Sequence, residues 1–534
     1  MKFSLRTKVI LFGLLVLLGL IFRVPTTPHE IGWDSFSVHL MANSVSEFGY
    51  AKWWLHPTSI TGSYPYSTSP SAVPFVLSGI SQCTSMDTEK VIFLYSIFLG
   101  LFAIFGAYLM AGVIWDNDIF TFLVAIVFST AQGMVTFSTW TAHARTLFVI
   151  SLPLFIYLLL KAHTFKVRCS ILTFIILALL LVTHHYIYFT IPVLMSFFII
   201  AIFYKFGKHI KAIKISESFA NFAMLGCFLI MFSIGYFDRS LWWSDPEMVR
   251  SASEGSSSIY MWISNMMLMG YVRYIGFLII FTVSGYIYLI FKRNKRFEEW
   301  VLLLCLACLA PLLYIVTYVK WFIIPFVSLL IGIALANIAI VKTHTQKRKL
   351  VPSLVVITIL VLSISFTGYY QYLHFLNDPS PRTRYMEERT YAGGLWMKDN
   401  IDKDNNMIVG GWIAHRIFSI SKVPTLTGVC AADLAYGFVE PGKLEVKEIY
   451  SSTSLGYYRH DPYAVVNHSY TDWHVAHILD GDINDKRSWA YRLIPKFNLS
   501  YYAVNKDIRD RLSLSVQQTK DYLYDNGKIG VWHL

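Results

Sequence analysis

Long apolar stretches alternate with polar ones from the amino terminus to about Gly368. A helix needs roughly 20 mostly apolar residues to cross a bilayer, and a search with windows of that length finds about eleven candidates. We therefore predict a polytopic α-helical membrane protein with about eleven transmembrane helices. The predicted spans are centred near Val9–Phe22, Val91–Ile114, Ile119–Phe137, Leu147–Leu160, Ile171–Val182, Ile187–Tyr204, Phe219–Phe237, Tyr274–Phe291, Trp300–Tyr318, Phe322–Val341 and Val351–Gly368.

The polar segments divide the chain into a transmembrane domain, residues 1–370, and a C-terminal domain, residues 371–534. Within the first of these, residues 23–90 and 238–271 are long segments between spans, which we expect to be loops on one side of the membrane. The tail is large enough to fold on its own, and its mixed patterns predict a small α/β domain. Its clearest elements are a helix at Thr390–Asn400 and strands at Met407–Val409, Leu499–Val504 and Ile529–Trp532.

The segment 238–271 mixes tryptophan and methionine with charged residues, among them Trp242, Trp243 and Glu254. Such a composition suits an amphipathic helix that lies along the membrane interface. It suits equally well a flap that closes over a lipid-linked substrate. The sequence leaves these two interpretations open.

Composition and charge support the membrane class and give an orientation. With 55% hydrophobic and 15% charged residues, the chain is too apolar for a soluble protein. The net charge of +12 would suit a nucleic-acid partner, but the basic residues fall in alternate loops, all on one predicted side. The positive-inside rule makes that side cytoplasmic, so we expect a multi-pass protein of the cell membrane with a cytoplasmic amino terminus, an exterior C-terminal domain and no nucleic-acid partner. The basic clusters are Lys2, Arg6 and Lys8; Lys161, Lys166 and Arg168; Lys205, Lys208, Lys211 and Lys214; Lys292, Arg293, Lys295 and Arg296; and Lys342, Lys347, Arg348 and Lys349.

Ionisable residues beside the spans gather on the opposite, exterior side. Such groups are costly in or near a bilayer, so a cluster of them on one face is a candidate functional site. Five separate exterior turns contribute to this cluster. Its members are Glu30, Asp34 and His39 after the first span, His143 and Arg145 after the third, His184 and His185 after the fifth, Glu254 after the seventh, and Lys320 after the ninth.

These residue types suit the transfer of a sugar from a lipid phosphate. A positioned carboxylate such as Asp34 is able to remove the proton of the acceptor group. Arg145 and Lys320 are able to hold the departing phosphate, and the histidines suit either role. Two simpler interpretations stay open: His184 and His185 as interfacial histidines bonded to backbone or headgroups, and Lys320 as a side chain that extends from a helix end toward water.

One possible cation site lies on the wrong side for this chemistry. Asp116-Asn117-Asp118 is a D-x-D pattern, and paired carboxylates hold divalent ions through oxygen ligands. The pattern follows the second span, which places it opposite Asp34. We therefore favour a solvated tight turn and predict no metal site there.

The segment around Asp34 resembles a known family. The runs Gly32–His39 and Glu47–Tyr50, followed by Tyr64-Pro65, resemble the first exterior loop of GT-C superfamily glycosyltransferases. The resemblance implies that Asp34 is catalytic and that the donor is a sugar on a polyprenyl or dolichyl phosphate or diphosphate, with Tyr64 among the substrate-binding residues. Val319–Pro325 is similar to the late segment of that superfamily in which a basic residue, here Lys320, contacts the donor phosphate.

Within the superfamily, the oligosaccharyltransferase catalytic subunit also ends in an exterior domain. Ser251–Glu254 looks like its motif on a late outer loop. Its W-W-D-x-G signature, however, is replaced by Gly410–His415, without the aspartate, and its second acidic motif is replaced by Trp140–Arg145. These departures favour a metal-independent transferase without a cofactor, and Mg²⁺ or Mn²⁺ is expected only under the oligosaccharyltransferase-like alternative.

The leading hypothesis is an integral membrane glycosyltransferase of GT-C type. It transfers a sugar from a polyprenyl-phosphate-linked donor to a glycan, lipid or protein acceptor at the exterior face, among membrane lipids. The first alternative is transfer of a whole lipid-linked glycan to protein asparagine. The second is a transporter of lipid-linked sugars, which is disfavoured because transporters place polar groups near the bilayer midplane on interrupted helices.

Overall fold

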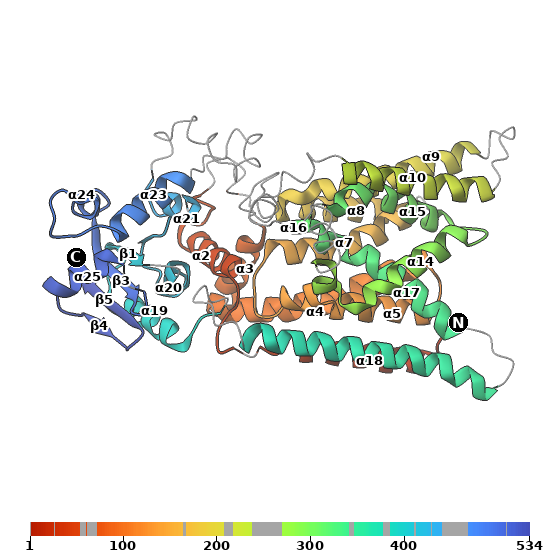
Figure 1. Ribbon diagram of the computed structural model, residues 1–534, viewed down its shortest axis with the longest axis horizontal. Coiled ribbons are helices and arrows are strands. Elements are labelled where there is room, and N and C mark those ends of the chain that lie inside the picture. Colours follow the sequence, from red (N-terminus) through yellow and green to blue (C-terminus); the bar gives the residue numbers. More distant parts are fainter. Residues whose placement is uncertain are drawn as a thin grey trace.

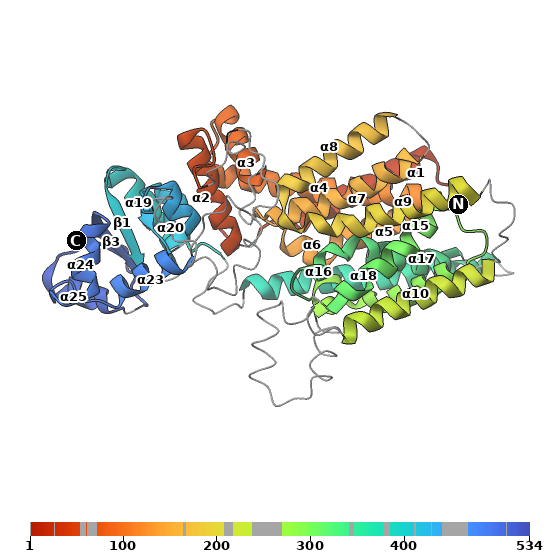
Figure 2. The ribbon, with the colours of Figure 1, turned by 90° about the horizontal axis from the view of Figure 1, so that it is seen from above.

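The computed structural model describes residues 2–25, 27–53, 60, 72–163, 167–207, 217–237, 270–314, 316–340, 346–376, 385–410, 413–428, 430–439, 468–508 and 510–534. Figures 1 and 2 show a body of long helices at one end and a part built on a β-sheet at the other. Helices α2 (Trp33–Phe48) and α3 (Ala72–Thr84) lie between the two in both views. The segment 23–90, predicted as a loop, therefore contains two helices at the junction.

Each predicted apolar stretch of the body contains an α-helix. Four helical stretches among the described residues are long and apolar enough to cross a membrane: Thr88–Ile114, Ala144–Ala162, Ile187–Lys205 and Pro352–Gln371. The chain is therefore that of a membrane protein, while the number of eleven spans stays a prediction. The helices of the body are α1 (Leu5–Ile21), α4 (Thr88–Ile114), α5 (Asp118–Thr130), α6 (Gln132–Thr136), α7 (Ala144–Ala162), α8 (Val167–Thr183), α9 (Thr190–Gly207), α10 (Glu217–Phe237), α14 (Ile280–Phe291), α15 (Phe297–Leu309), α16 (Val316–Phe322), α17 (Ile324–Ile340) and α18 (Gln346–Leu376), with short 3₁₀ turns η2 (His185–Phe189), η3 (Phe277–Ile279) and η4 (Ala310–Tyr314).

Several helix boundaries differ from the expectation, among them that of the third predicted span, which is divided between α5 and α6 at Ala131. The ninth predicted span, Trp300–Tyr318, is interrupted, because α15 ends at Leu309 and the chain continues through η4. Pro311 lies in this turn, and a proline has no backbone N–H to continue the α-helical bonding. Helix α18 runs without interruption to Leu376, past the predicted division of the chain at residue 370. That division stays a prediction.

The described turns Asp116–Asp118 and Lys292–Arg296 lie with the amino-terminal segment at one end of the body (Figure 1). Lys2 pairs with Asp116, and Lys8 Nζ lies 3.0 Å from Asp118 Oδ1. The backbone N–H of Phe3 donates to Asp118 Oδ2 at 2.6 Å. The amino-terminal segment therefore binds the carboxylates of the D-x-D pattern. Asp116 is exposed, as a solvated turn requires, whereas Asp118 is buried.

The sheet of the C-terminal part is mixed and five-stranded, in the order β2-β1-β3-β5-β4. Strand β1 pairs in parallel with β2 and β3, whereas β5 pairs antiparallel with β3 and β4. The helix and the three strands predicted for the tail are present, and the short strands β2 and β4 were not predicted. The elements are β1 (Asn406–Gly410), β2 (Thr425–Leu426), β3 (Leu499–Asn505), β4 (Tyr524–Asp525), β5 (Ile529–His533), α19 (Glu388–Asn400), α20 (Ala414–Ser421), α21 (Cys430–Ala435), α23 (His468–Leu479), α24 (Trp489–Lys496) and α25 (Arg511–Thr519).

Alternate residues of the strands feed two separate cores, as the two-residue period of a strand requires. Ile408 and Trp532 pack with the helices that follow β2, α23 to α25, on one face of the sheet. Met407 and Val531 pack with α19 and α20 on the other face. The sheet is thus covered on both sides, and α20 also packs against α2.

Close packing of α14 on α17 gives a test of the helical body. A Cβ added to Gly285 would lie 2.0 Å from the carbonyl oxygen of Leu330, whereas one added to Gly226 of α10 would meet nothing within 4 Å. Forcing an extra methyl group into a packed contact costs about 1–3 kcal/mol. We expect Gly285→Ala to lower the thermal unfolding midpoint of the purified protein in detergent, and Gly226→Ala to leave it unchanged or raise it. Equal midpoints for the two variants would contradict this packing.

Candidate active site at the junction of the helices and the sheet

The amino-terminal end of α2 forms the centre of the candidate site. The preceding residue, Gly32, has φ of +103°, a conformation that favours glycine. A Cβ at this position would lie 3.1 Å from both His143 Nε2 and Thr141 Oγ1. Gly32 thus lets the segment after α6 approach the start of α2. Asp34 lies in the first turn of this helix, where the helix dipole favours a negative charge.

Two predicted basic residues converge on Asp34. Arg145 pairs with Asp34 Oδ2, and His143 Nδ1 lies 3.3 Å from the same oxygen. The carboxylate keeps contact with solvent, because the Asp34 side chain is 44% exposed. Partial burial alone would favour the neutral carboxyl, but the charge of Arg145 and the neighbouring His143 imidazole outweigh it and hold the pKa of Asp34 well below its ordinary value. Asp34 is therefore ionised at neutral pH.

A pair of aromatic rings connects Arg145 with Lys320. The Arg145 guanidinium lies 4.6 Å from the ring centroid of Trp321, and Lys320 Nζ lies 4.6 Å from that of Tyr274. The two rings contact each other edge to face, with centroids 5.4 Å apart. Cations are attracted to aromatic faces, so this pair holds both side chains near the same part of the junction. The structure therefore brings Asp34, Arg145 and Lys320 together from three distant parts of the chain.

The predicted residue His184 lies next to this group. It is buried, and its ring lies 6.0 Å from that of Phe322 and 6.1 Å from that of Phe148. It therefore contacts the helix that carries Lys320 and the helix that carries Arg145. His185 begins η2, and its side chain is outside the described residues, as are Tyr64 and Glu254. The roles of these three stay predictions.

Two other predicted residues, Glu30 and His39, are buried beneath Asp34. Glu30 is fully buried, and its Oε1 lies 2.7 Å from His39 Nδ1. The Ser35 hydroxyl donates to Glu30 Oε2 at 3.2 Å and accepts from the N–H of Ala142 at 2.9 Å. Burial disfavours the charged imidazole, but Glu30 outweighs it and raises the pKa of His39. This network joins α2 to the segment that carries His143, so Glu30 and His39 support the site from below and do not line its surface.

The backbone on both sides of this network is also tied together. Ile31 N–H donates to the carbonyl of Trp140 at 2.9 Å, and Met386 N–H donates to the carbonyl of Glu30 at 3.3 Å. Ile31 forms an isolated bridge with Tyr385. The two residues before Gly32 are therefore bonded to the helical body on one side and to the C-terminal part on the other.

His29 is a residue of the junction that the sequence did not single out. Its Nδ1 lies 2.9 Å from Glu89 Oε1, its Nε2 lies 3.0 Å from Glu388 Oε2, and its ring stacks on Tyr391 at 3.8 Å. A histidine with a carboxylate at each nitrogen donates to both only when it is protonated. Burial opposes this charge, but Glu89 and Glu388 outweigh it and raise the pKa of His29. His29 thus links the first segment after α1 with α4 and α19.

The C-terminal part reaches the candidate site through His415. Its ring contacts that of Trp33 edge to face, with centroids 4.1 Å apart, and Trp33 is the direct neighbour of Asp34. Burial, with the charge of Arg416, lowers the pKa of His415 to about 3, so this imidazole is neutral. The sequence had singled out Gly410–His415 only for its missing aspartate. The structure places its last residue beside α2.

Basic side chains share one oxygen of the Asp34 carboxylate. Both Arg145 and His143 contact its Oδ2. Within the described ranges, no group of three or more histidine, cysteine, aspartate or glutamate side chains is arranged to hold a metal. That the site works without a metal ion stays a prediction.

Comparisons with known proteins place the fold. No protein-family model matches the sequence, and no curated protein matches it. Among solved structures, the apo oligosaccharyltransferase of Archaeoglobus fulgidus is similar with a TM-score of 0.60 and 11% identity, over 93% of this chain and 69% of that one. ArnT of Cupriavidus metallidurans, solved with undecaprenyl phosphate, is similar with a TM-score of 0.56 and 11% identity. The similarity covers 99% of this chain and 98% of that one.

A third similar structure is the archaeal oligosaccharyltransferase AglB of Archaeoglobus fulgidus, in complex with an inhibitory peptide and a dolichol-phosphate. It gives a TM-score of 0.56 and 12% identity, over 94% of this chain and 70% of that one. The chain has the fold of GT-C membrane glycosyltransferases. The resemblance seen around Asp34 is therefore confirmed at the level of the GT-C fold, and a fold does not by itself specify a substrate.

The raised pKa of His29 predicts a pH-dependent stability for this protein. A group whose pKa is raised by folding stabilises the fold fully below its unfolded pKa, about 6.5 for histidine, and loses this effect as the pH rises through the folded value. We expect the thermal midpoint of the wild type to exceed that of His29→Gln by a few degrees at about pH 6 and by less at about pH 9. His533→Gln, at an exposed histidine of β5, is the control and should show no such trend. A difference that does not change with pH would contradict a protonated His29.

Proposed function

We propose that this protein is a membrane glycosyltransferase that takes a sugar from a polyprenyl- or dolichyl-phosphate-linked donor at the exterior membrane face. The observation that carries the proposal is the carboxylate of Asp34 at the start of α2, partly open to solvent and bound by Arg145 and His143. The fold supports it, since ArnT is solved with undecaprenyl phosphate and AglB with a dolichol-phosphate. The acceptor is a glycan, a lipid or a protein.

Asp34 acts on the acceptor in this proposal. The acceptor hydroxyl or amide gives its proton to the Asp34 carboxylate while its oxygen or nitrogen forms a bond to the anomeric carbon of the donor sugar. The bond from that carbon to the lipid phosphate oxygen breaks, and the phosphate leaves with the electron pair. A carboxylate in reach of the reacting group is suited to such proton removal.

Donor binding prepares Asp34 for this step. A carboxylate whose pKa is held far down by a cation has little tendency to accept a proton. The donor phosphate competes with Asp34 for the Arg145 guanidinium, because both are anions that bind it strongly. When Arg145 turns to the phosphate, Asp34 loses its nearest positive charge and its pKa rises. The base is therefore activated only when the donor is in place.

Lys320 is the second phosphate contact of the proposal. The rings of Trp321 and Tyr274 lie between Arg145 and Lys320. In the proposal, the donor phosphate therefore meets one cation from α7 and one from α16. Such cations stabilise the negative charge that grows on the leaving group. Glu30, His39 and Ser35 hold the geometry of α2 from beneath.

The alternative is transfer of a whole lipid-linked glycan to protein asparagine. The similarity to the oligosaccharyltransferase of Archaeoglobus fulgidus over 93% of this chain favours it. The cation around Asp34 here is Arg145, which speaks for the first proposal. Treatment of the protein with a metal chelator separates the two, since lost transfer would favour the alternative. A transporter of lipid-linked sugars is a third proposal, and transport without transfer would support it.

The proposal predicts that Asp34→Asn abolishes transfer. The amide cannot accept the proton, and loss of a general base lowers rates by about 10²–10⁴-fold. The assay supplies membranes with a lipid-linked sugar donor and measures labelled product. Asp116→Asn, at an exposed aspartate of the opposite end, is the matched control and should keep full activity. Undiminished transfer by Asp34→Asn would remove Asp34 from the mechanism.

A second prediction separates the two proposed phosphate contacts. Arg145→Gln and Lys320→Gln should each raise the KM for the lipid-linked donor about 10- to 100-fold, the usual effect of losing a charged hydrogen bond. Only Arg145→Gln should also move the acidic limb of the pH profile of kcat/KM to higher pH, because Asp34 of the free enzyme then lacks the cation that lowers its pKa. Arg296→Gln, an exposed arginine at the other end, is the control. Unchanged KM in both variants would exclude them as phosphate contacts.

A further inference from the structure

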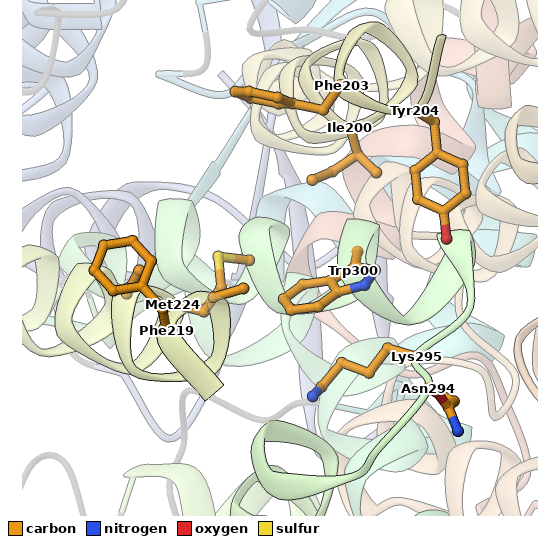
Figure 3. Close-up of a pocket in the computed structure, with 10 residues that line it drawn as sticks. Ile200, Phe203, Tyr204, Phe219, Met224, Asn294, Lys295 and Trp300 are labelled. Carbon is orange, nitrogen blue, oxygen red and sulfur yellow. The ribbon is translucent and has the colours of Figure 1, made fainter. Parts of the chain in front are cut away.

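A groove lies at the end of the helical body opposite the candidate site. Helices α9 and α10 both pack against α15, and a cavity of about 520 Å³ opens between them. Figure 3 shows Ile200 and Phe203 of α9 and Phe219 and Met224 of α10 around this space, with Trp300 of α15 between the two helices. The volume is within the range of about 300–1,000 Å³ that is usual for ligand sites.

The walls of the groove are apolar and face the surroundings of the body. Phe203 is 67% exposed and Phe219 is 66% exposed, and they stand on either side of the opening. They lie near the ends of two apolar helices. Exposed aromatic side chains near the ends of membrane-spanning helices contact the bilayer. A molecule that enters the groove therefore comes from the lipid.

The groove has one charged residue in its polar end. Lys295 lies beneath Trp300 in Figure 3, and its side chain is buried, with the residue 7% exposed. Its Nζ donates to Asn221 Oδ1 at 2.6 Å and to the carbonyl of Lys292 at 2.7 Å, and it lies 4.9 Å from the Trp300 ring centroid. The ammonium is thus fixed in place at the inner end of an apolar channel.

Its basic neighbours on the same turn are oriented differently. Lys292 pairs with Glu299, and Arg296 Nε lies 3.4 Å from Glu298 Oε2. Arg293 is exposed. Among the four basic residues of this turn, Lys295 is the one whose side chain lines the groove.

We propose that the groove binds an anionic phospholipid of the membrane leaflet at the amino-terminal end. The lipid phosphate lies at the Lys295 ammonium, and one acyl chain lies between α9 and α10 on the Trp300 ring. Charge complementarity selects the anionic headgroup, and the apolar walls select a lipid over a free phosphate ion. Under the predicted orientation this is the cytoplasmic leaflet. The site is separate from Asp34 and does not depend on the proposed transfer reaction.

The test measures lipid retention by the full-length protein. The detergent-purified protein is incubated with phosphatidylglycerol or phosphatidylcholine of the same acyl chains, and bound lipid is counted by native mass spectrometry. We expect preferential retention of phosphatidylglycerol. Lys295→Gln should lower that preference about tenfold or more, the effect of losing a hydrogen bond to a charged group. Arg293→Gln, in the same turn, should keep it.

A second variant tests the groove itself without changing charge. Ala223 lines the cavity from α10 and is exposed, so Ala223→Phe fills the groove without disturbing the core. It should reduce retention of both lipids. Retained preference in Lys295→Gln, full retention in Ala223→Phe, or equal binding of the two lipids by the wild type would overturn the proposal. Displacement of phosphatidylglycerol by excess inorganic phosphate would assign the site to a free anion and overturn it as well.

Discussion

The candidate site depends on how a fully buried carboxylate is compensated. Glu30 has no contact with solvent, so its charge must be met by groups of the protein. His39 and the Ser35 hydroxyl supply this compensation from the same helix that carries Asp34, and Ser35 in turn accepts from the backbone of Ala142. The cost of burying Glu30 is thus offset by contacts that also set the distance between Asp34 and its basic neighbours.

The hydropathy pattern was sufficient to predict the helices and to sort the ionisable residues by side. This sorting assigned Asp34, Arg145 and Lys320 to the same predicted side of the membrane, although they lie far apart in the sequence. The pattern carries this information because apolar length is encoded locally, and because successive loops between spans fall on alternate sides. Strands β1, β3 and β5 of the five-stranded sheet were predictable for the same reason, from short apolar runs.

Contacts that depend on packing were not accessible to that reasoning. His29 and Glu388 are separated by 359 positions, and nothing in either local sequence marks them as partners. The contact of Trp33 with His415 and the ring pair of Tyr274 and Trp321 also join residues that are far apart in the sequence. Glu30 and His39 were predicted to bind the substrate, whereas the structure buries both of them in a network beneath Asp34. The sequence thus indicated where along the chain the site residues lie, but it did not indicate which of their side chains are buried.

The backbone bonds from Tyr385 and Met386 to the residues just before Gly32 tie the C-terminal part to the start of α2. A change in the tail that shifts the 385–386 segment therefore shifts the reacting carboxylate of the proposal as well. Substitutions in the two parts are for this reason coupled through the backbone. A tail taken from another protein would fit this helical body only if it reproduced the same backbone register.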